Sequence, residues 1–464
     1  MAWSRDEILA ATGGRLLREG GKKRFGEVVT DSSKVRRGSV FVALKGERLD
    51  GHRFVGAAVR RGASCIIVHR ALRPSVFRDA AVIRVPDTLL ALGGLAHYRR
   101  EIFAPKVLAI TGSNGKTTTK EMVTAILEET SINGQLLRGR VLKTEGNFNN
   151  LVGLPLTLLR LRRRDAVAVV ELGTNHPGEI ERLAEIADPD MAMITSVAPA
   201  HLEGLNSLAG VAREKGSLYQ KVRAGGSIAV NLDDPWVARL GAKFKGRKIT
   251  YGARGRIGAE SWRSFGAKGT LLNLRVSRQR ARVRLNFLGD HNVANAVGAA
   301  ALAYGFGARL AAIRRGLESA KPFAMRMQIE DWHGIGIIND AYNANPASME
   351  AAVRTLAAID CRGERIAVLG DMFELGRQSL RQHKLLGMRV AEARLDHLYL
   401  LGRQAMQVRQ GALRGGMPSE KIIIGKSHRE IARRLQNHVK QGDWLLLKGS
   451  RGMRMEKVLS ELKG

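Results

Sequence analysis

Short apolar runs recur along the chain, and many of them end in a polar or glycine-rich turn. In the middle of the sequence, the runs at 106–110, 165–173 and 191–197 alternate with stretches in which apolar residues repeat at helical spacing. This alternation is typical of a doubly wound sheet, in which parallel strands are covered by helices. We therefore predict an α/β fold whose central part is a parallel sheet.

The two ends of the chain carry a similar pattern. Before residue 103, apolar runs at 40–44 and 64–68 flank a helical pattern at 54–61. After residue 322, strand-like runs lie at 335–339, 365–369, 397–401 and 443–447. A chain of 464 residues is expected to form about three domains at roughly 150 residues each. We predict a small α/β domain at 1–102, a central domain at 103–322 and a Rossmann-like domain at 323–464.

One turn of the central part has the composition of a phosphate-binding loop. The motif Thr111-Gly-Ser-Asn-Gly-Lys-Thr-Thr-Thr119 follows a strand-like run and leads into a helical pattern. Gly112 and Gly115 allow the backbone N–H groups to turn toward a phosphate. Lys116 can reach the terminal phosphates, and Thr117 can offer a hydroxyl to Mg²⁺. The loop is shorter than the strict Walker pattern, but we interpret it as a P-loop-like ATP site; the alternative is a glycine-rich helix start with an incidental lysine.

Polar side chains that follow other apolar runs could complete this site. Glu171 ends a buried-strand pattern, where a carboxylate beside a phosphate loop can hold magnesium. Asn147, Asn149 and Asn150 supply amide groups that could grip a phosphate or a peptide-like substrate. Each feature also has an ordinary interpretation, which is a surface carboxylate at a strand end for Glu171 and turn chemistry for the asparagines.

Several other polar positions cannot be assigned from their spacing alone. His201 is a lone loop histidine, and Lys215 lies on a helical pattern where a salt-bridged surface lysine is the ordinary interpretation. Asn292 and Asn295 are one helical turn apart and could face one ligand. Polar turns that are either plain loops or binding edges lie at 28–33, 45–52, 340–346, 370–376 and 448–452.

The charge of the chain is unusual. Lysine and arginine outnumber aspartate and glutamate by 76 to 43, which gives a formal net charge of +33. Such a charge attracts polyanions, so a nucleic-acid partner has to be considered. The basic residues are scattered, however, and aromatic residues make up only 5% of the chain, which leaves little for base stacking. We predict no specific nucleic-acid binding and interpret the charge as a solvated surface or as attraction of an anionic substrate.

The sequence carries no signal for secretion or membrane insertion. The first residues contain no apolar signal-peptide core, and no run of about 18 apolar residues could span a bilayer. Cys65 and Cys361 lie far apart and lack metal-ligand spacing, which argues against a disulfide framework or a zinc site. We expect a cytoplasmic protein without membrane insertion, in which both thiols are buried and inert.

Five polar stretches stand out by their order along the chain. They are Thr111-Gly-Ser-Asn-Gly-Lys-Thr-Thr-Thr-Lys120, Glu145-Gly-Asn-Phe-Asn-Asn150, Glu171-Leu-Gly-Thr-Asn-His-Pro-Gly-Glu-Ile180, Ala341-Tyr-Asn-Ala-Asn-Pro346 and Leu369-Gly-Asp-Met-Phe-Glu-Leu-Gly376. With them, nearly the whole chain resembles the Mur ligases of peptidoglycan synthesis, and most closely the members that join D-alanyl-D-alanine to UDP-N-acetylmuramoyl-tripeptide. The resemblance implies an ATP-dependent amide ligase that activates a carboxylate as an acyl phosphate, and we expect a monomer. One domain would bind the UDP-substrate, one would bind ATP, and one would close over both and bring the dipeptide.

The resemblance also implies roles for individual residues. The nucleotide would contact Gly112, Ser113, Asn114, Gly115, Lys116, Thr117, Thr118, Asn292, Asn295, Arg326 and Asp340. The UDP-substrate and the peptide would contact Asp31, Ser32, Lys45, Asp50, Gly51, His52, Asn147, Asn149, Asn150, Tyr342, Asn343 and Asn345. Magnesium would be held by Thr117, Glu171, His201 and, if CO₂ carbamylates it, Lys215. The catalytic residues would be Lys116, Lys215, His201 and Arg326.

Three positions depart from the family pattern. Family members often have Asp-Ser-Arg where this chain has Asp31-Ser-Ser33, often Lys-Gly-Glu where it has Lys215-Gly-Ser217, and usually Asp-Asp where it has Asn339-Asp340. None of these departures removes a catalytic part. Two rival functions stay open, a folate polyglutamate ligase of the same superfamily and a basic ATPase that acts on nucleic acid. The sequence also leaves open whether the third residue of the peptide is diaminopimelate or lysine.

Overall fold

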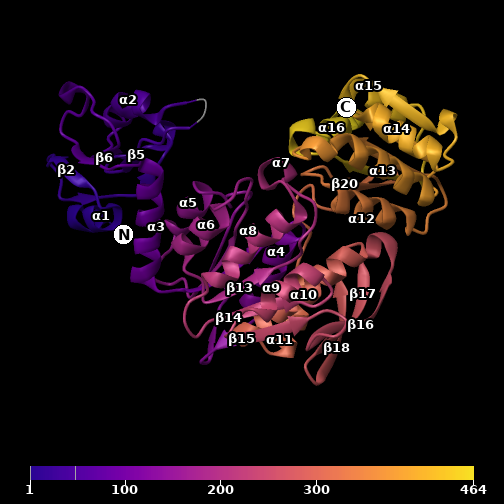
Figure 1. Ribbon diagram of the computed structural model, residues 1–464, viewed down its shortest axis with the longest axis horizontal. Helices are drawn as coiled ribbons and strands as arrows, with labels where there is room; N and C mark the ends of the chain where they lie inside the picture. The colour runs from indigo at the N-terminus through magenta and orange to yellow at the C-terminus, as the bar shows by residue number, and fades with distance from the viewer. Residues whose placement is uncertain (1, 47–48) are drawn as a thin grey trace.

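The structure, a computed structural model, describes residues 2–46 and 49–464. In this part of the chain, three large sheets with their own helices follow one another (Figure 1). Most neighbouring strands are parallel, which confirms the predicted α/β class. The sheets lie within the ranges 1–102, 103–322 and 323–464. The limits themselves stay predictions, because helix α3 (Thr88–Phe103) crosses the first limit and packs against central helices.

The N-terminal domain is built on a five-stranded sheet in the order β2-β7-β6-β5-β4. Its strands are β2 (Arg15–Arg18), β4 (Val28–Val29), β5 (Val40–Val42), β6 (Cys65–Val68) and β7 (Ala81–Arg84), and β1 (Trp3–Ser4) pairs with β3 (Arg24–Phe25). Its helices are α1 (Arg5–Thr12), α2 (Val55–Arg60) and α3. The residues of β5 and β6 are all buried, which explains their continuous apolar runs. The strands expected near 40–44 and 64–68 are therefore confirmed.

The central domain contains a nine-stranded sheet in the order β11-β12-β8-β13-β14-β15-β16-β17-β18. Its strands are β8 (Lys106–Thr111), β11 (Val141–Lys143), β12 (Val167–Glu171), β13 (Met191–Ile194), β14 (Ser227–Asn231), β15 (Arg247–Tyr251), β16 (Ile257–Ser264), β17 (Thr270–Val276) and β18 (Gln279–Leu285). Its helices are α4 (Lys116–Glu128), α5 (Gly153–Leu158), α6 (Glu179–Ala187), α7 (Leu202–Leu205), α8 (Leu208–Gln220), α9 (Pro235–Ala242), α10 (Asp290–Phe306) and α11 (Leu310–Ser319). A short pair, β9 (Ser131–Ile132) and β10 (Gln135–Leu136), lies outside this sheet.

The prediction that the central sheet is parallel is wrong for its last strands. β16, β17 and β18 pair antiparallel and form one edge of the sheet. In β18, arginines alternate with apolar residues, and Val283 and Leu285 are buried while Arg282 and Arg284 are exposed. This period of two suits a strand with one face on a helix, here α11, and the other in water.

The central sheet has its switch point at β8, which lies between β12 and β13. After β8 the chain adds strands on one side, and from β13 onward it adds them on the other. The helices that follow such strands cover opposite faces, so a crevice forms at their carboxyl ends, where open α/β sheets bind ligands. The phosphate loop follows β8 at this point.

The C-terminal domain has a six-stranded sheet in the order β19-β20-β24-β21-β22-β23. Its strands are β19 (Gln328–Trp332), β20 (Ile335–Asp340), β21 (Arg365–Gly370), β22 (His397–Leu401), β23 (Ile422–Gly425) and β24 (Trp444–Lys448). Its helices are α12 (Pro346–Ala357), α13 (Ser379–Glu392), α14 (Ala405–Arg414), α15 (His428–Gln436) and α16 (Glu456–Lys463). Apart from β19, its strands are parallel, so the carboxyl ends of β20, β24 and β21 share one edge.

The central domain contacts both of the other domains. The apolar core around α3, which includes Leu92 and Leu95, is continuous with the core on one face of the central sheet. Between the central and C-terminal domains, α10 contacts α12, and α7 contacts the short turn Gly376–Gln378. The carboxyl edge of the third sheet therefore lies near the phosphate loop. Within the described residues, no helix is long and apolar enough to cross a membrane.

Candidate active site

The phosphate loop has a backbone that depends on glycine. Gly112 and Gly115 have φ angles of 150° and 80°. A Cβ at Gly112 would overlap the Thr195 hydroxyl, and a Cβ at Gly115 would overlap the side-chain amide of Asn295. The two glycines therefore allow the loop to pack against its neighbours and to lead into α4 at Lys116. The N-terminus of α4 offers free N–H groups and partial positive charge to an anion.

Thr117 and Glu171 meet beside this loop. Thr117 Oγ1 donates a hydrogen bond to Glu171 Oε2 at 2.8 Å, and Asn149 Nδ2 donates to Glu171 Oε1 at 2.8 Å. Glu171 ends β12, which is parallel to β8, and its residue exposure is only 1%. The interpretation of Glu171 as a surface carboxylate is therefore wrong. The structure brings together oxygen donors of the kind that Mg²⁺ prefers.

Asn149 belongs to the polar stretch 145–150, and the other two asparagines of that stretch differ in their roles. Asn150 Oδ1 accepts hydrogen bonds from the backbone N–H groups of Val152 and Gly153 at 3.2 and 2.8 Å, at the start of α5. This is the turn chemistry that the ordinary interpretation assumed. Asn147 makes no such cap in the described structure and lines a cleft.

The side chain of Lys116, the first residue of α4, folds back onto the phosphate loop that precedes it. Its Nζ donates to the carbonyl oxygen of Gly112 at 2.7 Å. Burial lowers the pKa of Lys116 below its ordinary value; the Glu171 carboxylate opposes this shift, and Arg326 adds to it. The ammonium is therefore held in a site that favours the arrival of a negative charge.

Lys215 is not a surface lysine. It lies on α8 and is 1% exposed, and no hydrogen bond or ion pair of its Nζ is found among residues 2–46 and 49–464. The pKa of Lys215 lies well below its ordinary value of 10.5 because burial disfavours the ammonium; Lys116 adds to this effect and Glu214 opposes it. The interpretation as a salt-bridged surface residue is therefore wrong, and the side chain has a bias toward the neutral amine.

His201 connects the central domain to the C-terminal domain. It directly precedes α7 in a left-handed conformation, with φ of 53°. Its Nδ1 lies 2.5 Å from Glu374 Oε2, and this hydrogen bond lowers the pKa of Glu374. His201 and Glu171 line the same cleft. In the described structure no hydrogen bond joins His201, Glu171 and Lys215, so their common role as magnesium ligands stays a prediction.

Asn292 and Asn295 face one another on α10. Asn295 Nδ2 donates to Asn292 Oδ1 at 3.0 Å, and Asn292 Nδ2 donates to the carbonyl oxygen of Leu288 at 2.8 Å. Asn295 Oδ1 also lies 3.5 Å from the Thr119 hydroxyl, behind the phosphate loop. Both asparagines line the cleft, as one shared ligand would require, but their contact with the nucleotide stays a prediction.

The C-terminal domain places charged side chains opposite the phosphate loop. The Arg326 guanidinium lies over the Tyr342 ring at 4.1 Å, and its buried Nε has no hydrogen-bond partner within the described chain. Asp340 Oδ2 lies 2.5 Å from Lys448 Nζ, and its Oδ1 accepts from the backbone N–H of Met327 at 3.1 Å. This side of the cleft thus combines the Arg326 cation, whose Nε–H can still donate a hydrogen bond, with the Asp340 carboxylate, which is paired with Lys448.

Asn343 and Asn345 hold this edge in place. The carbonyl oxygen of Asn343 accepts from Lys448 Nζ at 3.0 Å. Asn345 caps α12, with its Oδ1 accepting from the backbone N–H of Ser348 at 2.9 Å. Its Nδ2 donates to Asn114 Oδ1 at 2.8 Å, so the cap is joined to the phosphate loop of the central domain. These bonds make Asn345 a link between the two domains.

These residues form the walls of a single cleft of about 740 Å³. Its volume lies within the roughly 300–1,000 Å³ range of small-molecule and cofactor sites. The predicted site residues that line it are Ser113, Asn114, Gly115, Lys116, Thr117, Thr118, Asn147, Asn149, Asn150, Glu171, His201, Asn292, Asn295, Arg326, Asp340, Tyr342, Asn343 and Asn345. Sequence reasoning missed Glu374 and Lys448 as members of this site, although both belong to polar turns that follow strands.

The predicted uridine-binding residues lie in the N-terminal domain and do not line this cleft. Asp31 caps a short turn through the Ser33 backbone N–H at 2.8 Å, which is consistent with turn chemistry. Asp50 accepts from the His52 backbone and lies 2.7 Å from His52 Nδ1, and the backbone hydrogen bond is the largest cause that lowers the Asp50 pKa. Ser32, Lys45 and Gly51 belong to the same turns; positions 47 and 48 between them lie outside the described residues.

The two cysteines differ. Cys65 is fully buried in β6, and burial raises its pKa to about 12. Cys361 is only partly buried, so the expectation that both thiols are buried is wrong for this residue. Its Sγ lies 3.3 Å from the carbonyl oxygen of Gly363, far along the chain from the phosphate loop.

Family models match three regions of the chain. The Mur ligase family catalytic domain matches residues 25–100, the Mur ligase middle domain matches residues 110–303, and the Mur ligase glutamate ligase domain matches residues 325–451. The chain belongs to the Mur ligase family, and as a member of it the chain is an ATP-dependent ligase.

Individual relatives are similar along almost their whole length. Proteins named UDP-N-acetylmuramoyl-tripeptide–D-alanyl-D-alanine ligase are 37% identical in Escherichia coli (strain K12), with 94% of this chain and 93% of the relative covered, and 33% identical in Bacillus subtilis (strain 168), with 94% and 92% covered. A crystal structure of MurF from Acinetobacter baumannii has a TM-score of 0.91 at 34% identity and covers 100% of this chain and 99% of its own. A MurF ligase from Thermotoga maritima in complex with ADP has a TM-score of 0.84 at 29% identity, with 94% and 97% covered.

Proposed function

We propose that the chain joins D-alanyl-D-alanine to UDP-N-acetylmuramoyl-tripeptide at the expense of ATP, a step in peptidoglycan precursor synthesis. The observation that carries the proposal is the cleft in which the phosphate loop of the central domain faces Arg326 and Asp340 of the C-terminal domain. The names of relatives that are 33–37% identical over 94% of the chain support the choice of substrates.

The chemistry needs an activated carboxylate, because an amine does not attack a free carboxylate at neutral pH. The terminal carboxylate of the tripeptide attacks the γ-phosphate of ATP, which gives an acyl phosphate and ADP. The free amine of D-alanyl-D-alanine then attacks the acyl carbon, phosphate leaves, and the amide nitrogen loses a proton. No covalent bond to the protein is required.

Lys116 and Arg326 reduce the electrostatic cost of the first step. Two anions, the carboxylate and the γ-phosphate, must come into contact, and positioned cations offset their repulsion. Lys116 offers its charge from the phosphate loop, and Arg326 offers its charge from the opposite wall of the cleft. Because the Arg326 Nε lacks a partner within the described chain, it is free to donate to an oxygen of the substrate.

The residues around Glu171 fit a magnesium ion. Glu171 and Thr117 present a carboxylate and a hydroxyl oxygen at the edge of the cleft. Glu374 contacts Nδ1 of His201, and among the described residues no hydrogen bond engages its Nε2. A carboxylate in this position is common behind a histidine that ligates a metal. When bound, Mg²⁺ would neutralise phosphate charge.

We propose that CO₂ carbamylates Lys215, which turns its amine into an anion. The reaction forms a bond between the lysine nitrogen and the carbon of CO₂, and the nitrogen loses one proton. It needs a neutral amine, and the lowered pKa of Lys215 favours this form. The resulting anion would balance the positive charge of Lys116 and of a nearby cation.

The other substrate contacts also stay proposals. Lys45 is exposed and could meet the pyrophosphate of the UDP-substrate, together with Ser32 and the turn at Gly51. Tyr342 and Asn343 would receive the dipeptide at the carboxyl edge of the third sheet. A monomeric state and a cytoplasmic location remain expectations from the sequence.

The rivals have less support. A folylpolyglutamate synthase structure from Mycobacterium tuberculosis is only 16% identical, with a TM-score of 0.63, so the likeness concerns the fold alone. An ATPase that acts on nucleic acid would need a basic surface with stacking aromatics, and aromatic residues make up 5% of the chain.

The test is phosphate release measured with each substrate omitted in turn. We expect release only when ATP, UDP-N-acetylmuramoyl-tripeptide and D-alanyl-D-alanine are all present, with one amide product per phosphate. Release that is stimulated by DNA or RNA without these substrates would favour the nucleic-acid ATPase. Release with a folate and glutamate would favour the folate ligase.

A further inference from the structure

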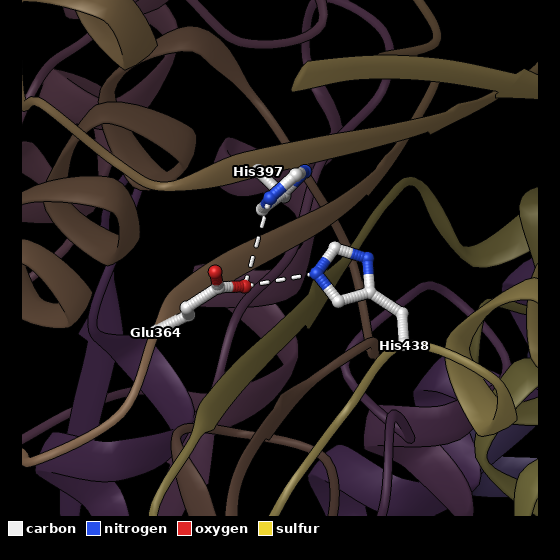
Figure 2. Close-up of side chains that lie close together, drawn as sticks. All are labelled: Glu364, His397 and His438. Carbon is white, nitrogen blue, oxygen red and sulfur yellow. Dashed lines mark hydrogen bonds and ion pairs between the residues drawn. The ribbon is translucent and has the colours of Figure 1, made fainter. Parts of the chain in front are cut away.

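Three side chains that could hold a metal ion meet in the C-terminal domain (Figure 2). Glu364 directly precedes β21, His397 is the first residue of β22, and His438 follows α15. One possible ligand atom of each residue lies within 4.8 Å of those of the other two. Glu364 Oε2 is 2.8 Å from His438 Nε2 and 3.6 Å from His397 Nε2.

A neighbouring tyrosine orients one of the two imidazoles. Tyr399 Oη lies 2.7 Å from His438 Nδ1, so His438 directs its Nε2 toward Glu364. Histidines that bind metals commonly engage their second ring nitrogen in this way. Glu364 is also fixed through its backbone, since its N–H donates to Asp443 at 2.8 Å and its carbonyl oxygen accepts from Trp444 at 2.8 Å.

A plain hydrogen-bond chain does not account for His397. Its ring lies edge-on to that of His438, with 4.1 Å between the centroids, and no hydrogen bond of its Nε2, the nitrogen that faces Glu364, is found among the described residues. The 3.6 Å between His397 Nε2 and Glu364 Oε2 is too long for a hydrogen bond. The His397 imidazole therefore lies against a second histidine and a carboxylate but makes no hydrogen bond to either. A ligand that joins all three side chains would explain this arrangement.

The ligase chemistry does not account for the cluster either. The parallel strands β21 and β22 begin at this cluster and run toward the edge where Asp340 and Lys448 end β20 and β24. A strand of this length separates the two edges by roughly 15–20 Å. None of the three residues lines the cleft that contains the phosphate loop.

We propose that Glu364, His397 and His438 bind one divalent transition-metal ion of the Zn²⁺ class, which stabilises the C-terminal domain. Two imidazole nitrogens and one carboxylate oxygen suit Zn²⁺ rather than Mg²⁺, and water would fill the fourth position. Ligand atoms about 2.0–2.1 Å from a tetrahedral ion are about 3.3 Å apart. The two distances to Glu364 Oε2, 2.8 and 3.6 Å, lie on either side of that value. The ion would join the starts of β21 and β22 to the segment after α15.

The two cysteines take no part in this site. Their wide spacing excludes only a zinc site built on cysteine ligands. Glu364, His397 and His438 meet only in the folded domain. Residues 364, 397 and 438 have no metal-motif spacing, and the cluster could not be found without the register of β21 and β22.

The proposal is tested by titrating the chelator-treated, full-length protein with Zn²⁺ or Co²⁺ in the presence of excess Mg²⁺. We expect one tight site, followed by calorimetry for Zn²⁺ and by visible absorption for Co²⁺. The double variant His397→Gln/His438→Gln should lose this site. His333→Asn, which changes an exposed turn histidine outside the cluster, is the matched control and should keep it.

A second variant guards against misfolding of the double variant. Glu364→Gln keeps the size of the side chain and a hydrogen-bond acceptor, so it should fold, yet its affinity for Zn²⁺ should fall at least tenfold. At a free Zn²⁺ concentration about a hundredfold above the wild-type Kd, the melting transition of the C-terminal domain should rise by roughly 5 °C or more in the wild type and by about half as much or less in Glu364→Gln. Equal Zn²⁺ affinity in the wild type and both cluster variants, or no Zn²⁺ binding by the wild type, would overturn the proposal.

Discussion

Replacement of Lys215 by methionine should stabilise the protein and inactivate it at the same time. Methionine has a similar length and volume and carries no charge, so the buried site can accept it without a large cavity. Burial holds the pKa of Lys215 well below 10.5, and each tenfold bias against the ammonium corresponds to about 1.4 kcal/mol. In bicarbonate-free buffer at neutral pH, we therefore expect Lys215→Met to raise the free energy of unfolding, because the variant no longer carries the cost of burying an ammonium.

The pH dependence of this gain has a definite sign. Because the folded protein lowers the Lys215 pKa, the unfolded chain binds the proton more tightly, and wild-type stability rises with pH between the lowered pKa and 10.5. The advantage of methionine is therefore largest at low pH and fades as the pH approaches 10.5. Denaturant unfolding of both proteins at a series of pH values measures it.

Although Lys215→Met should be more stable than the wild type, it should be less active. If the carbamate is required, Lys215→Met should lower kcat by at least about a hundredfold, as loss of a positioned electrostatic group does elsewhere. Lys215→Ala should be partly rescued by acetate, which can occupy the space of the carbamate, and depletion of CO₂ should slow the wild type. Lys221→Met is the matched control, since Lys221 follows the same helix in exposed ion pairs with Glu181 and Glu185, worth about 0–1 kcal/mol. A stable and active Lys215→Met enzyme would refute the carbamate.

Three further predictions concern the cleft and the surface charge. Lys116→Ala should keep the fold by circular dichroism and lower kcat/KM by at least about a hundredfold, roughly 3 kcal/mol; near-normal turnover would remove the phosphate-loop assignment. Glu171→Gln keeps an acceptor for the Thr117 hydroxyl but loses a negative charge, so activity should need a higher Mg²⁺ concentration; an unchanged Mg²⁺ titration would contradict its role. Added salt should lower kcat/KM for the anionic UDP-substrate and change that for the zwitterionic dipeptide little, because attraction by the +33 charge is screened over about 8 Å; equal sensitivity would exclude steering.

The parts of the site that were predictable from the sequence are those with local causes. The glycines of the phosphate loop are needed for the loop backbone itself, so Gly112 and Gly115 identify it without knowledge of the fold. Glu171 was predictable because a carboxylate at the end of a parallel strand next to such a loop has few other places to lie. The alternating arginines of β18 are a similarly local signal, which favours an antiparallel edge strand over the parallel strand that we predicted.

Other features depend on tertiary contacts that no spacing encodes. The burial of Lys215 depends on which face of α8 packs inward, and this is set by neighbours that are distant in sequence. The sequence Asn345-Pro346 is typical of a helix N-terminus, but the hydrogen bond from Asn345 to Asn114 exists only because two domains meet. In the same way, Glu364, His397 and His438 come together only through the register of two strands and a loop.

In the proposed reaction, ATP activates the tripeptide carboxylate in the cleft between the phosphate loop and Arg326. This activation is tested most directly by labelling the terminal carboxylate of UDP-N-acetylmuramoyl-tripeptide with ¹⁸O and measuring the released phosphate by mass spectrometry. If an acyl phosphate forms, one labelled oxygen moves from the carboxylate to the phosphate for each amide made with D-alanyl-D-alanine. Amide formation with unlabelled phosphate would contradict the account.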